Sequence, residues 1–272
     1  MPIVVLPFPH IDPVLIEFGP LVIRWYALAY LAGLLIGWKL AFALAANAAL
    51  WGSRTPPDHA TIDDLIVYMA LGIVVGGRLG NVVFYDLAYF IDNPLEIFAV
   101  WHGGMAFHGG LIGACIAMVL LARVHQTPIL AITDIAAIVS PVGLFFGRIA
   151  NFINGELWGR PADVPWAMVF PRADEQPRHP SQLYEATLEG LLLFLIIGWI
   201  ARMGGLKRPG LLSGLFGILY AVTRTISEFY RDPDPVSEQL AGGFTMGMAL
   251  SAPLALIGLG LVWRSFRKVA NP

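Results

Sequence analysis

Seven apolar stretches, each long enough to cross a lipid bilayer, limit how this chain can fold. A hydrocarbon core about 30 Å thick requires roughly 20 apolar residues per helix. The stretches lie near residues 20–46, 64–90, 106–123, 130–152, 184–202, 211–229 and 244–264. The third, rich in glycine and alanine, is the shortest. The sequence therefore predicts an all-α integral membrane protein with seven transmembrane helices.

The composition agrees with a membrane protein of one domain. Hydrophobic residues make up 57% of the 272 residues and charged residues only 13%, whereas soluble domains carry about 25% charged residues. We expect residues 1–272 to form a single transmembrane catalytic domain. The net charge of −2 argues against nucleic-acid binding. Cys115 is the only cysteine, so there is neither a disulfide framework nor a cysteine-rich metal site.

The distribution of lysine and arginine predicts the orientation. With the C-terminus inside, one side holds eight basic residues: Arg54, Arg123, Arg202, Lys207, Arg208, Arg264, Arg267 and Lys268. The other side holds four: Arg160, Arg172, Arg178 and Arg231. We therefore expect the N-terminus outside and the C-terminus inside, because positive charge collects in the cytoplasm. An outer connector at about 153–183 and a polar cavity open to the outer leaflet follow from this arrangement.

The N-terminus and the connectors complete this layout. Met1–Val5 lacks the basic region of a signal peptide, so the first span is expected to be retained. Proline and charged residues mark the connectors Gly52–Asp58, Gly204–Gly210 and Asp232–Glu238.

Polar side chains inside the apolar stretches are the candidates for function. They are Arg24, Lys39, Arg78, His108, Arg148, Asn151, Asn154, Glu156, Arg224 and Glu228. An arginine at the bilayer centre costs about 2.5–3.5 kcal/mol on insertion scales, so such residues face the bundle interior and have polar partners. Structural ion pairs, or snorkelling of Arg24 and Lys39 to a headgroup, are the alternative explanation.

Two segments concentrate these residues. Tyr220, Arg224 and Glu228 are spaced at i, i+4 and i+8, so they share one helix face. The run 147–159 contains an arginine, two asparagines, a glutamate and three glycines. Capping of a helix end by Asn and Gly would use only one or two of these groups. Both segments therefore predict a functional site.

A third segment, 101–111, contains two His-Gly-Gly units. His108 lies deeper in the predicted span than His102 and is the better catalytic candidate. No carboxylate or third ligand accompanies it at helical spacing, so the segment does not read as a zinc site.

These residues resemble the bacterial prolipoprotein diacylglyceryl transferase family. Residues 147–159 match its pattern Gly-Arg-x-(Gly/Ala)-Asn-Phe-hydrophobic-Asn-x-Glu-x-x-Gly at every defined position. Further similar segments are Trp25-Tyr26, Gly76-Gly77-Arg78, Phe107–Leu111, Arg178–Glu185 and the Tyr220/Arg224/Glu228 face. Ala106 stands where serine is expected, and the 160–178 connector is short.

The resemblance implies a reaction in the bacterial cytoplasmic (inner) membrane. The family transfers the sn-1,2-diacylglyceryl group of phosphatidylglycerol to the lipobox cysteine in a prolipoprotein signal peptide. The transfer forms a thioether and releases glycerol phosphate. The substrate brings the thiol, so the enzyme needs no cysteine of its own, and no cofactor or metal is expected.

The chemistry suggests roles for the candidates. Guanidinium groups fit phosphate bidentately and favour the charge that develops on it, so Arg148 and Arg224 are expected to hold the phosphate. Asn151 and Asn154 would orient headgroup oxygens, and Glu156 and Glu228 would position the arginines or bind the glycerol hydroxyls. Gly159 and Tyr220 complete the predicted lipid site. His108 is the expected proton acceptor, with Tyr26 nearby as an orienting or hydrogen-bonding group, although the sequence leaves the identity of the base open.

Two other function classes fit the sequence less well. A transporter would have an inverted repeat or paired broken helices, and the sequence shows neither. An intramembrane protease needs a Ser–His dyad or paired aspartates. Ser213 lies at the predicted cytoplasmic end, away from the other candidates.

Overall fold

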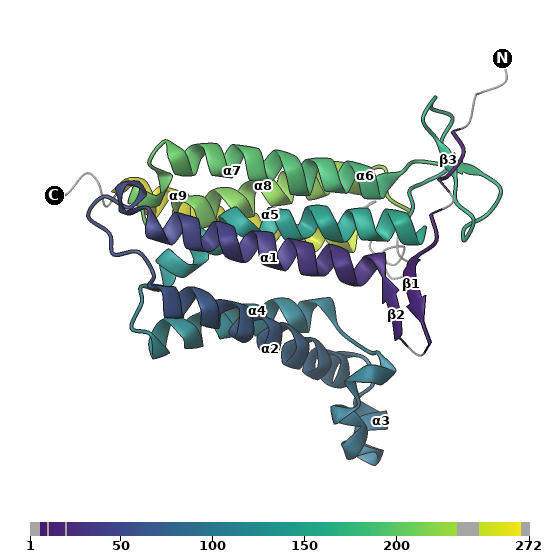
Figure 1. Ribbon diagram of the computed structural model, residues 1–272, viewed down its shortest axis with the longest axis horizontal. Coiled ribbons are helices and arrows are strands. Elements are labelled where there is room, and N and C mark those ends of the chain that lie inside the picture. Colours follow the sequence, from purple (N-terminus) through teal and green to yellow (C-terminus); the bar gives the residue numbers. More distant parts are fainter. Residues whose placement is uncertain (1–5, 10, 20, 233–244, 268–272) are drawn as a thin grey trace.

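The computed structural model describes residues 6–9, 11–19, 21–232 and 245–267 (Figure 1). Pro20, Phe244, Lys268, the N-terminal segment Met1–Val5 and most of the predicted connector Asp232–Glu238 lie outside these ranges.

All seven expected stretches are mainly helical in the described residues, but Leu21–Arg24 of the first stretch forms a strand and its helix begins only at Trp25. The long helices are α1 (Trp25–Ala46), α2 (His59–Phe84), α4 (Phe107–Val124), α5 (Ile129–Asn154), the continuous α6–η4–α7 (Ser181–Glu185, Ala186–Leu192, Leu193–Arg202), α8 (Leu211–Glu228) and α9 (Met246–Arg267). Among the described helices, five are long and apolar enough to cross a membrane: α1, α2, α5, the segment Ser181–Arg202, and α9. Helix α4 is apolar but shorter.

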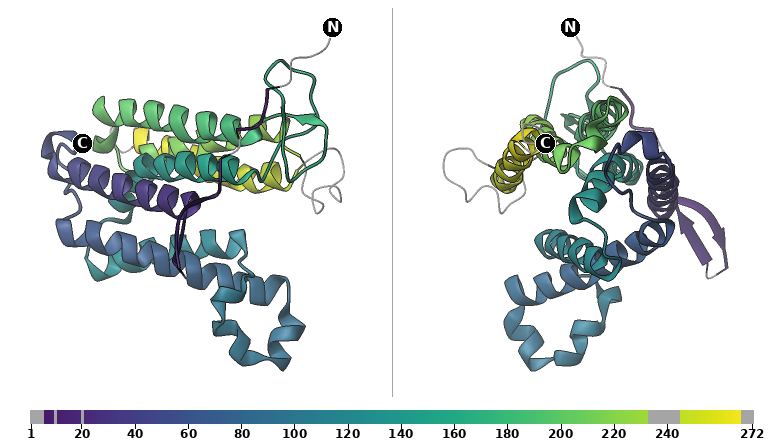
Figure 2. Two further views of the ribbon diagram at one scale, coloured as in Figure 1. Left: turned by 45° about the vertical axis from the view of Figure 1, so that its right-hand side comes forward. Right: turned by 90° about the vertical axis from the view of Figure 1, so that its left-hand side faces the viewer.

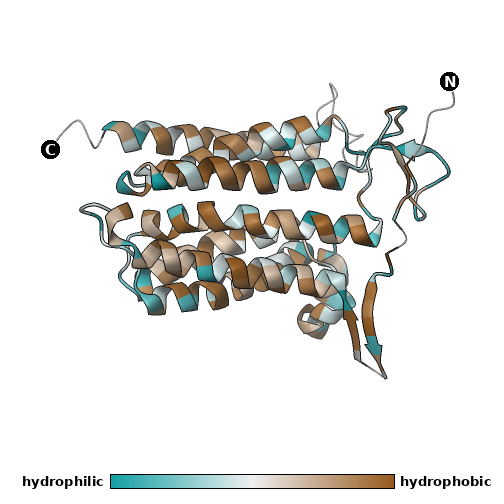
Figure 3. Ribbon diagram, turned by 45° about the horizontal axis from the view of Figure 1, so that its top comes forward, coloured by the Kyte–Doolittle hydropathy of each residue, from teal (hydrophilic) through white to brown (hydrophobic). Residues whose placement is uncertain are grey.

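Shorter elements lie between and around these helices. They are α3 (Leu87–Asp92), the 3-10 turns η1 (Ala48–Leu50), η2 (Pro94–Phe98), η3 (Val100–His102) and η5 (Gly205–Lys207), and the strands β1 (Val14–Phe18), β2 (Leu21–Arg24), β3 (Met168–Val169) and β4 (Pro177–Arg178). The strands form two small antiparallel sheets, so the described residues are mainly helical. Figure 3 shows apolar residues along the long helices and hydrophilic ones mainly at their ends.

The predicted boundaries of the second span are wrong by several residues. Helix α2 begins at His59 because the Asp58 side chain accepts a 2.7 Å hydrogen bond from the Thr61 backbone N–H, which satisfies a free donor of the first turn. It ends at Phe84, and residues 86–102 form a separate arm of α3, η2 and η3 (Figure 2).

Glycines set the closest helix contacts. A Cβ atom at Gly72 of α2 would lie 2.6 Å from the Gly113 carbonyl oxygen of α4. A Cβ atom at Gly214 of α8 would lie equally close to the Gly258 carbonyl oxygen of α9. Small residues permit such backbone approach in membrane bundles, so these helices pack as two tight pairs.

The two ends of the bundle have different elements. The β1–β2 hairpin, α3 and the connector 155–180 lie at one end, and the loops 47–58 and 203–210 lie at the other (Figure 1). At the second end, the buried Asp134 carboxylate of α5 accepts hydrogen bonds from the Gly210 and Ser213 backbone N–H groups and from Arg54. These contacts anchor the start of α8 to α5.

Candidate active site

Arg148 and Arg224 meet at one buried carboxylate. The Arg148 Nε atom, in the second-last turn of α5, lies 2.7 Å from Glu185 Oε2. The Arg224 Nη1 atom, on α8, lies 3.2 Å from the same oxygen. The Glu185 side chain is 1% exposed, whereas those of Arg148 and Arg224 are 19% and 12% exposed. Two guanidinium groups from different helices are thus held together while remaining partly accessible.

Three further residues extend this contact into a network. Glu189 Oε1 lies 3.6 Å from Arg224 Nη1, and Glu189 Oε2 lies 3.8 Å from Arg148 Nη2. Glu228 pairs with Arg224 one turn away on α8, and Arg231 Nη1 lies 3.5 Å from Glu185 Oε1. We call these six side chains the arginine network: Arg148, Glu185, Glu189, Arg224, Glu228 and Arg231.

A wide helical turn places the two central carboxylates. Glu185 ends α6, and Glu189 lies in η4, a π-helical segment over Ala186–Leu192. Such segments are rare and often occur at functional sites. Gly190 allows η4 to pack tightly on α5, because a Cβ atom there would lie 2.8 Å from the Phe145 Cα. The backbone that carries Glu189 is therefore fixed against α5.

A second polar cluster follows the end of α5. Glu156 Oε1 accepts hydrogen bonds from the Asn151 amide at 2.8 Å and from the Asn154 amide at 3.4 Å. The Gln182 amide donates to the Glu156 backbone oxygen at 2.7 Å. Glu156 therefore contacts two asparagines, whereas Glu185, Glu189 and Glu228 lie against the arginines. Binding of the glycerol hydroxyls, the other expected role of Glu156, stays a prediction.

Gly155 and Gly159 have distinct structural roles in this segment. Gly155 adopts the left-handed conformation at φ 63° and caps α5, with its N–H directed to the Asn151 and Phe152 carbonyl groups, so the capping explanation holds for this residue. A Cβ atom at Gly159 would lie 2.5 Å from the Tyr230 carbonyl oxygen and 2.6 Å from that of His179. Gly159 thus lets three segments meet beside Arg231.

The predicted tyrosines lie near the network. The hydroxyl oxygens of Tyr26 and Tyr30 are 3.1 Å apart on α1, and Tyr26 interacts electrostatically with Arg148 and Glu156. Tyr220, one turn before Arg224, interacts electrostatically with Glu189 and Arg224. Both tyrosines therefore belong to the neighbourhood that the sequence predicts.

His108 and Arg78 lie on the α2/α4 pair. His108 is half-buried in the first turn of α4. Arg78 is buried and donates hydrogen bonds to the backbone oxygens of Glu96, Ile97 and Gly103. Arg78 thus holds the arm 86–102 in place, and its partners are backbone carbonyl groups.

Sequence reasoning missed three members of the network as site residues. Glu185 and Glu189 are four residues apart in an apolar segment, and this spacing on a predicted span is the signal that could have identified them. Arg231 follows the predicted sixth span, and the predicted orientation places it among the basic residues on the outer side of the membrane.

The connector contributes titratable groups outside the helices. Asp174 pairs with Arg178 at 2.6 Å, and hydrogen bonds from Arg178 lower the Asp174 pKa. Burial lowers the pKa of His179, whose Nδ1 lies 3.0 Å from the Tyr184 hydroxyl oxygen. His179 is therefore favoured in its neutral form.

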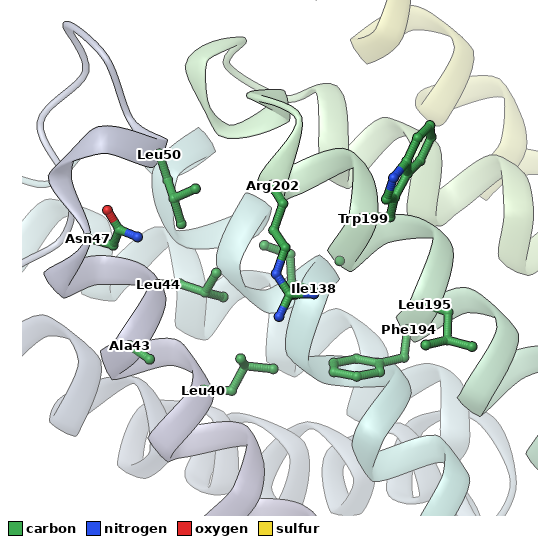
Figure 4. Close-up of a pocket in the computed structure, with 11 residues that line it drawn as sticks. Leu40, Ala43, Leu44, Asn47, Leu50, Ile138, Phe194, Leu195, Trp199 and Arg202 are labelled. Atoms are coloured by element: carbon green, nitrogen blue, oxygen red, sulfur yellow. The ribbon is translucent and has the colours of Figure 1, made fainter.

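A cavity of about 240 Å³ lies elsewhere in the bundle (Figure 4). Leucines of α1, Ile138, Phe194 and Trp199 line it together with two polar residues, Asn47 and Arg202. It is mainly apolar and lies toward the end of α7 that is remote from Glu185, so it is distinct from the predicted polar cavity.

Comparison with known proteins identifies the family of this chain. The chain matches the family described as prolipoprotein diacylglyceryl transferase over residues 13–264. It is 58% identical to the phosphatidylglycerol–prolipoprotein diacylglyceryl transferase of Methylocella silvestris, with 98% of each chain covered. It is 56% identical to the protein of that name from Beijerinckia indica, with 97% of each chain covered. The multi-pass helical chain therefore belongs to the prolipoprotein diacylglyceryl transferase family.

Proposed function

We propose that this protein transfers the diacylglyceryl group of phosphatidylglycerol to the thiol of a prolipoprotein cysteine. The observation that carries the proposal is the meeting of Arg148 and Arg224 on Glu185. Both guanidinium groups are partly accessible, and two guanidiniums can each take one free oxygen of a phosphodiester. Family membership supports the same reaction.

The reaction needs stabilisation of the leaving phosphate. Attack of the sulfur on the glyceryl carbon breaks a C–O bond, and the phosphate moves from one negative charge toward two. Groups that bind this charge better in the transition state than in the lipid lower the barrier. Arg148 and Arg224 are proposed to bind this charge, and Asn151, Asn154 and Tyr220 are proposed to orient the headgroup.

The thiol must also lose its proton. A free cysteine has a pKa near 8.5, so little thiolate is present at neutral pH. We assign His108 as the proton acceptor and Tyr26 as a group that orients the substrates near Arg148. Gly159 is proposed to shape the lipid site through the close backbone contacts that it permits.

The proposal includes the arrangement of the protein in the membrane. All seven long helices cross the cytoplasmic (inner) membrane, with the N-terminus outside and the C-terminus inside. The whole chain is one catalytic domain whose polar site opens toward the outer leaflet. Its partners are phosphatidylglycerol and the lipobox of a signal peptide.

Incubation of the purified protein with labelled phosphatidylglycerol and a lipobox peptide tests the reaction. We expect a peptide thioether that carries the diacylglyceryl label and an equal amount of free glycerol phosphate. A peptide with serine in place of its cysteine is the control and should stay unlabelled. Label on the serine peptide, or release of glycerol phosphate without a thioether, would overturn the proposal.

A further inference from the structure

Glu189 differs from the other glutamates of the arginine network. Its side chain is fully buried, and neither carboxylate oxygen accepts a hydrogen bond within the described part of the chain. Its nearest cationic atoms are 3.6 and 3.8 Å away, on Arg224 and Arg148. Glu185, in contrast, has ion pairs at 2.7 and 3.2 Å with the same arginines. A buried carboxylate without hydrogen bonds is costly, so these two arginines are the groups that favour the ionised form of Glu189.

The charges of the network balance before lipid binds. Three arginines face three glutamates, so six formal charges sum to zero: Arg148, Arg224 and Arg231 against Glu185, Glu189 and Glu228. A phosphodiester adds one negative charge and draws Arg148 and Arg224 away from the carboxylates. An uncompensated charge in a buried ion-pair network is strongly unfavourable. Uptake of one proton restores the balance.

Charged and titratable groups from the neighbouring helices decide which carboxylate takes up this proton. Arg148 comes from α5, Glu185 from α6, and Tyr220, Arg224 and Glu228 from α8. Glu185 and Glu228 each have a closer arginine partner than Glu189 does. Glu189 therefore loses the least when it becomes a neutral acid.

We propose that Glu189 binds a proton when a phosphodiester headgroup enters between Arg148 and Arg224, and that it donates this proton to the departing phosphate. The inference rests on the proposed function and adds a catalytic acid to it. Glu189 contacts the same two guanidinium groups that would hold the phosphate, so its proton lies close to the phosphate oxygens.

The step is balanced in atoms and charge. The S–C bond forms as the bond between the glyceryl carbon and the phosphate ester oxygen breaks, and the electron pair of the broken bond stays on that oxygen. The Glu189 proton moves to the phosphate, the thiol proton goes to a separate acceptor, and glycerol phosphate leaves as a monoanion. Glu189 is then a carboxylate again, and the empty network is neutral.

Calorimetric titration with a short-chain phosphatidylglycerol, in two buffers of different ionisation enthalpy, measures this proton. We expect the wild-type protein to take up about one proton per bound lipid. Glu189→Gln, whose amide resembles the protonated acid, should bind lipid without proton uptake. Its transfer rate should fall about 100-fold or more, as for loss of a general acid. Glu175→Gln, in the exposed connector, is the matched control and should keep both properties.

Equal proton uptake by Glu189→Gln and the wild type, or an unchanged transfer rate, would overturn the inference. If the variant does not fold, infrared difference spectroscopy of the wild type provides a second test. Lipid should produce the carbonyl band of a newly protonated carboxylic acid, and the absence of such a band means that Glu189 gains no proton when lipid binds. Thioether formation by the wild-type protein is measured in an independent assay. A protein that makes the thioether without proton uptake refutes the role of Glu189 alone, whereas one that makes none refutes the proposed function.

Discussion

The Arg148 Nε atom lies 2.7 Å from Glu185 Oε2, an oxygen that Arg224 also approaches at 3.2 Å. One carboxylate oxygen therefore sets the spacing of two guanidinium groups from different helices. Phosphate oxygens and carboxylate oxygens prefer the same guanidinium geometry, so this spacing supports the phosphate-binding role that we propose for the two arginines.

Arg148→Lys should reduce thioether formation about 100- to 1,000-fold, the range for loss of one donor to a developing charge. Lysine retains the charge but lacks the planar, two-pronged donor of arginine. The measurement is transfer of labelled lipid to a lipobox peptide by folded protein. Arg172→Lys, at an exposed position of the connector, is the control. Comparable activity of the two variants would contradict the phosphate role of Arg148.

Arg224→Lys should reduce thioether formation by a similar factor, and a second reason adds to the loss of the two-pronged donor. Arg224 contacts Glu185, Glu189 and Glu228 together, and a lysine cannot reach all three in one plane. The steady-state rate at saturating lipid separates binding from chemistry. A higher KM with an unchanged kcat would limit Arg224 to ground-state binding.

Cys115→Ala should leave transfer largely intact. The Cys115 side chain is exposed on α4, and the proposed nucleophile is the thiol of the substrate. Activity is measured with the variant, and with wild-type protein after treatment with a thiol reagent. A folded but inactive variant would mean that the enzyme uses its own thiol.

His108→Gln should remove the pH dependence of the transfer rate near neutrality. Imidazole is the side chain that ordinarily changes charge between pH 5 and 8, and glutamine has no such titration. The measurement is a pH–rate profile for both proteins at saturating substrates. An unchanged profile excludes His108 as the base.

His179 should affect stability rather than chemistry. Burial lowers the pKa of His179 in the folded protein, whereas an unfolded histidine titrates near 6.5. As the pH falls below about 6.5, the unfolded chain binds a proton that the folded protein does not, so the free energy of unfolding decreases until the lower folded pKa is passed. Thermal unfolding of His179→Gln should show a smaller acid-side decrease than the wild type. Identical decreases would contradict this.

The sequence by itself determined the helical membrane class and much of the site. Apolar length predicted the positions of the long helices, because a helix that crosses lipid must be apolar along its length. The cost of charge in lipid predicted that Arg148 and Arg224 face the interior. Helical spacing predicted that Arg224 and Glu228 share one helix face, because these residues lie one turn apart.

Tertiary structure decided which carboxylates meet those arginines. Glu185 and Glu189 reach Arg148 only because η4 packs on α5 through Gly190, and local spacing contains no information about such contacts between helices. Asn151 and Asn154, in contrast, meet Glu156 locally, at the end of α5. Among the residues that the structure describes, Glu189 has no hydrogen-bond partner. The type of a side chain and its helical spacing follow from the sequence. Its partner on another helix depends on which helices pack together and at which position along their axes.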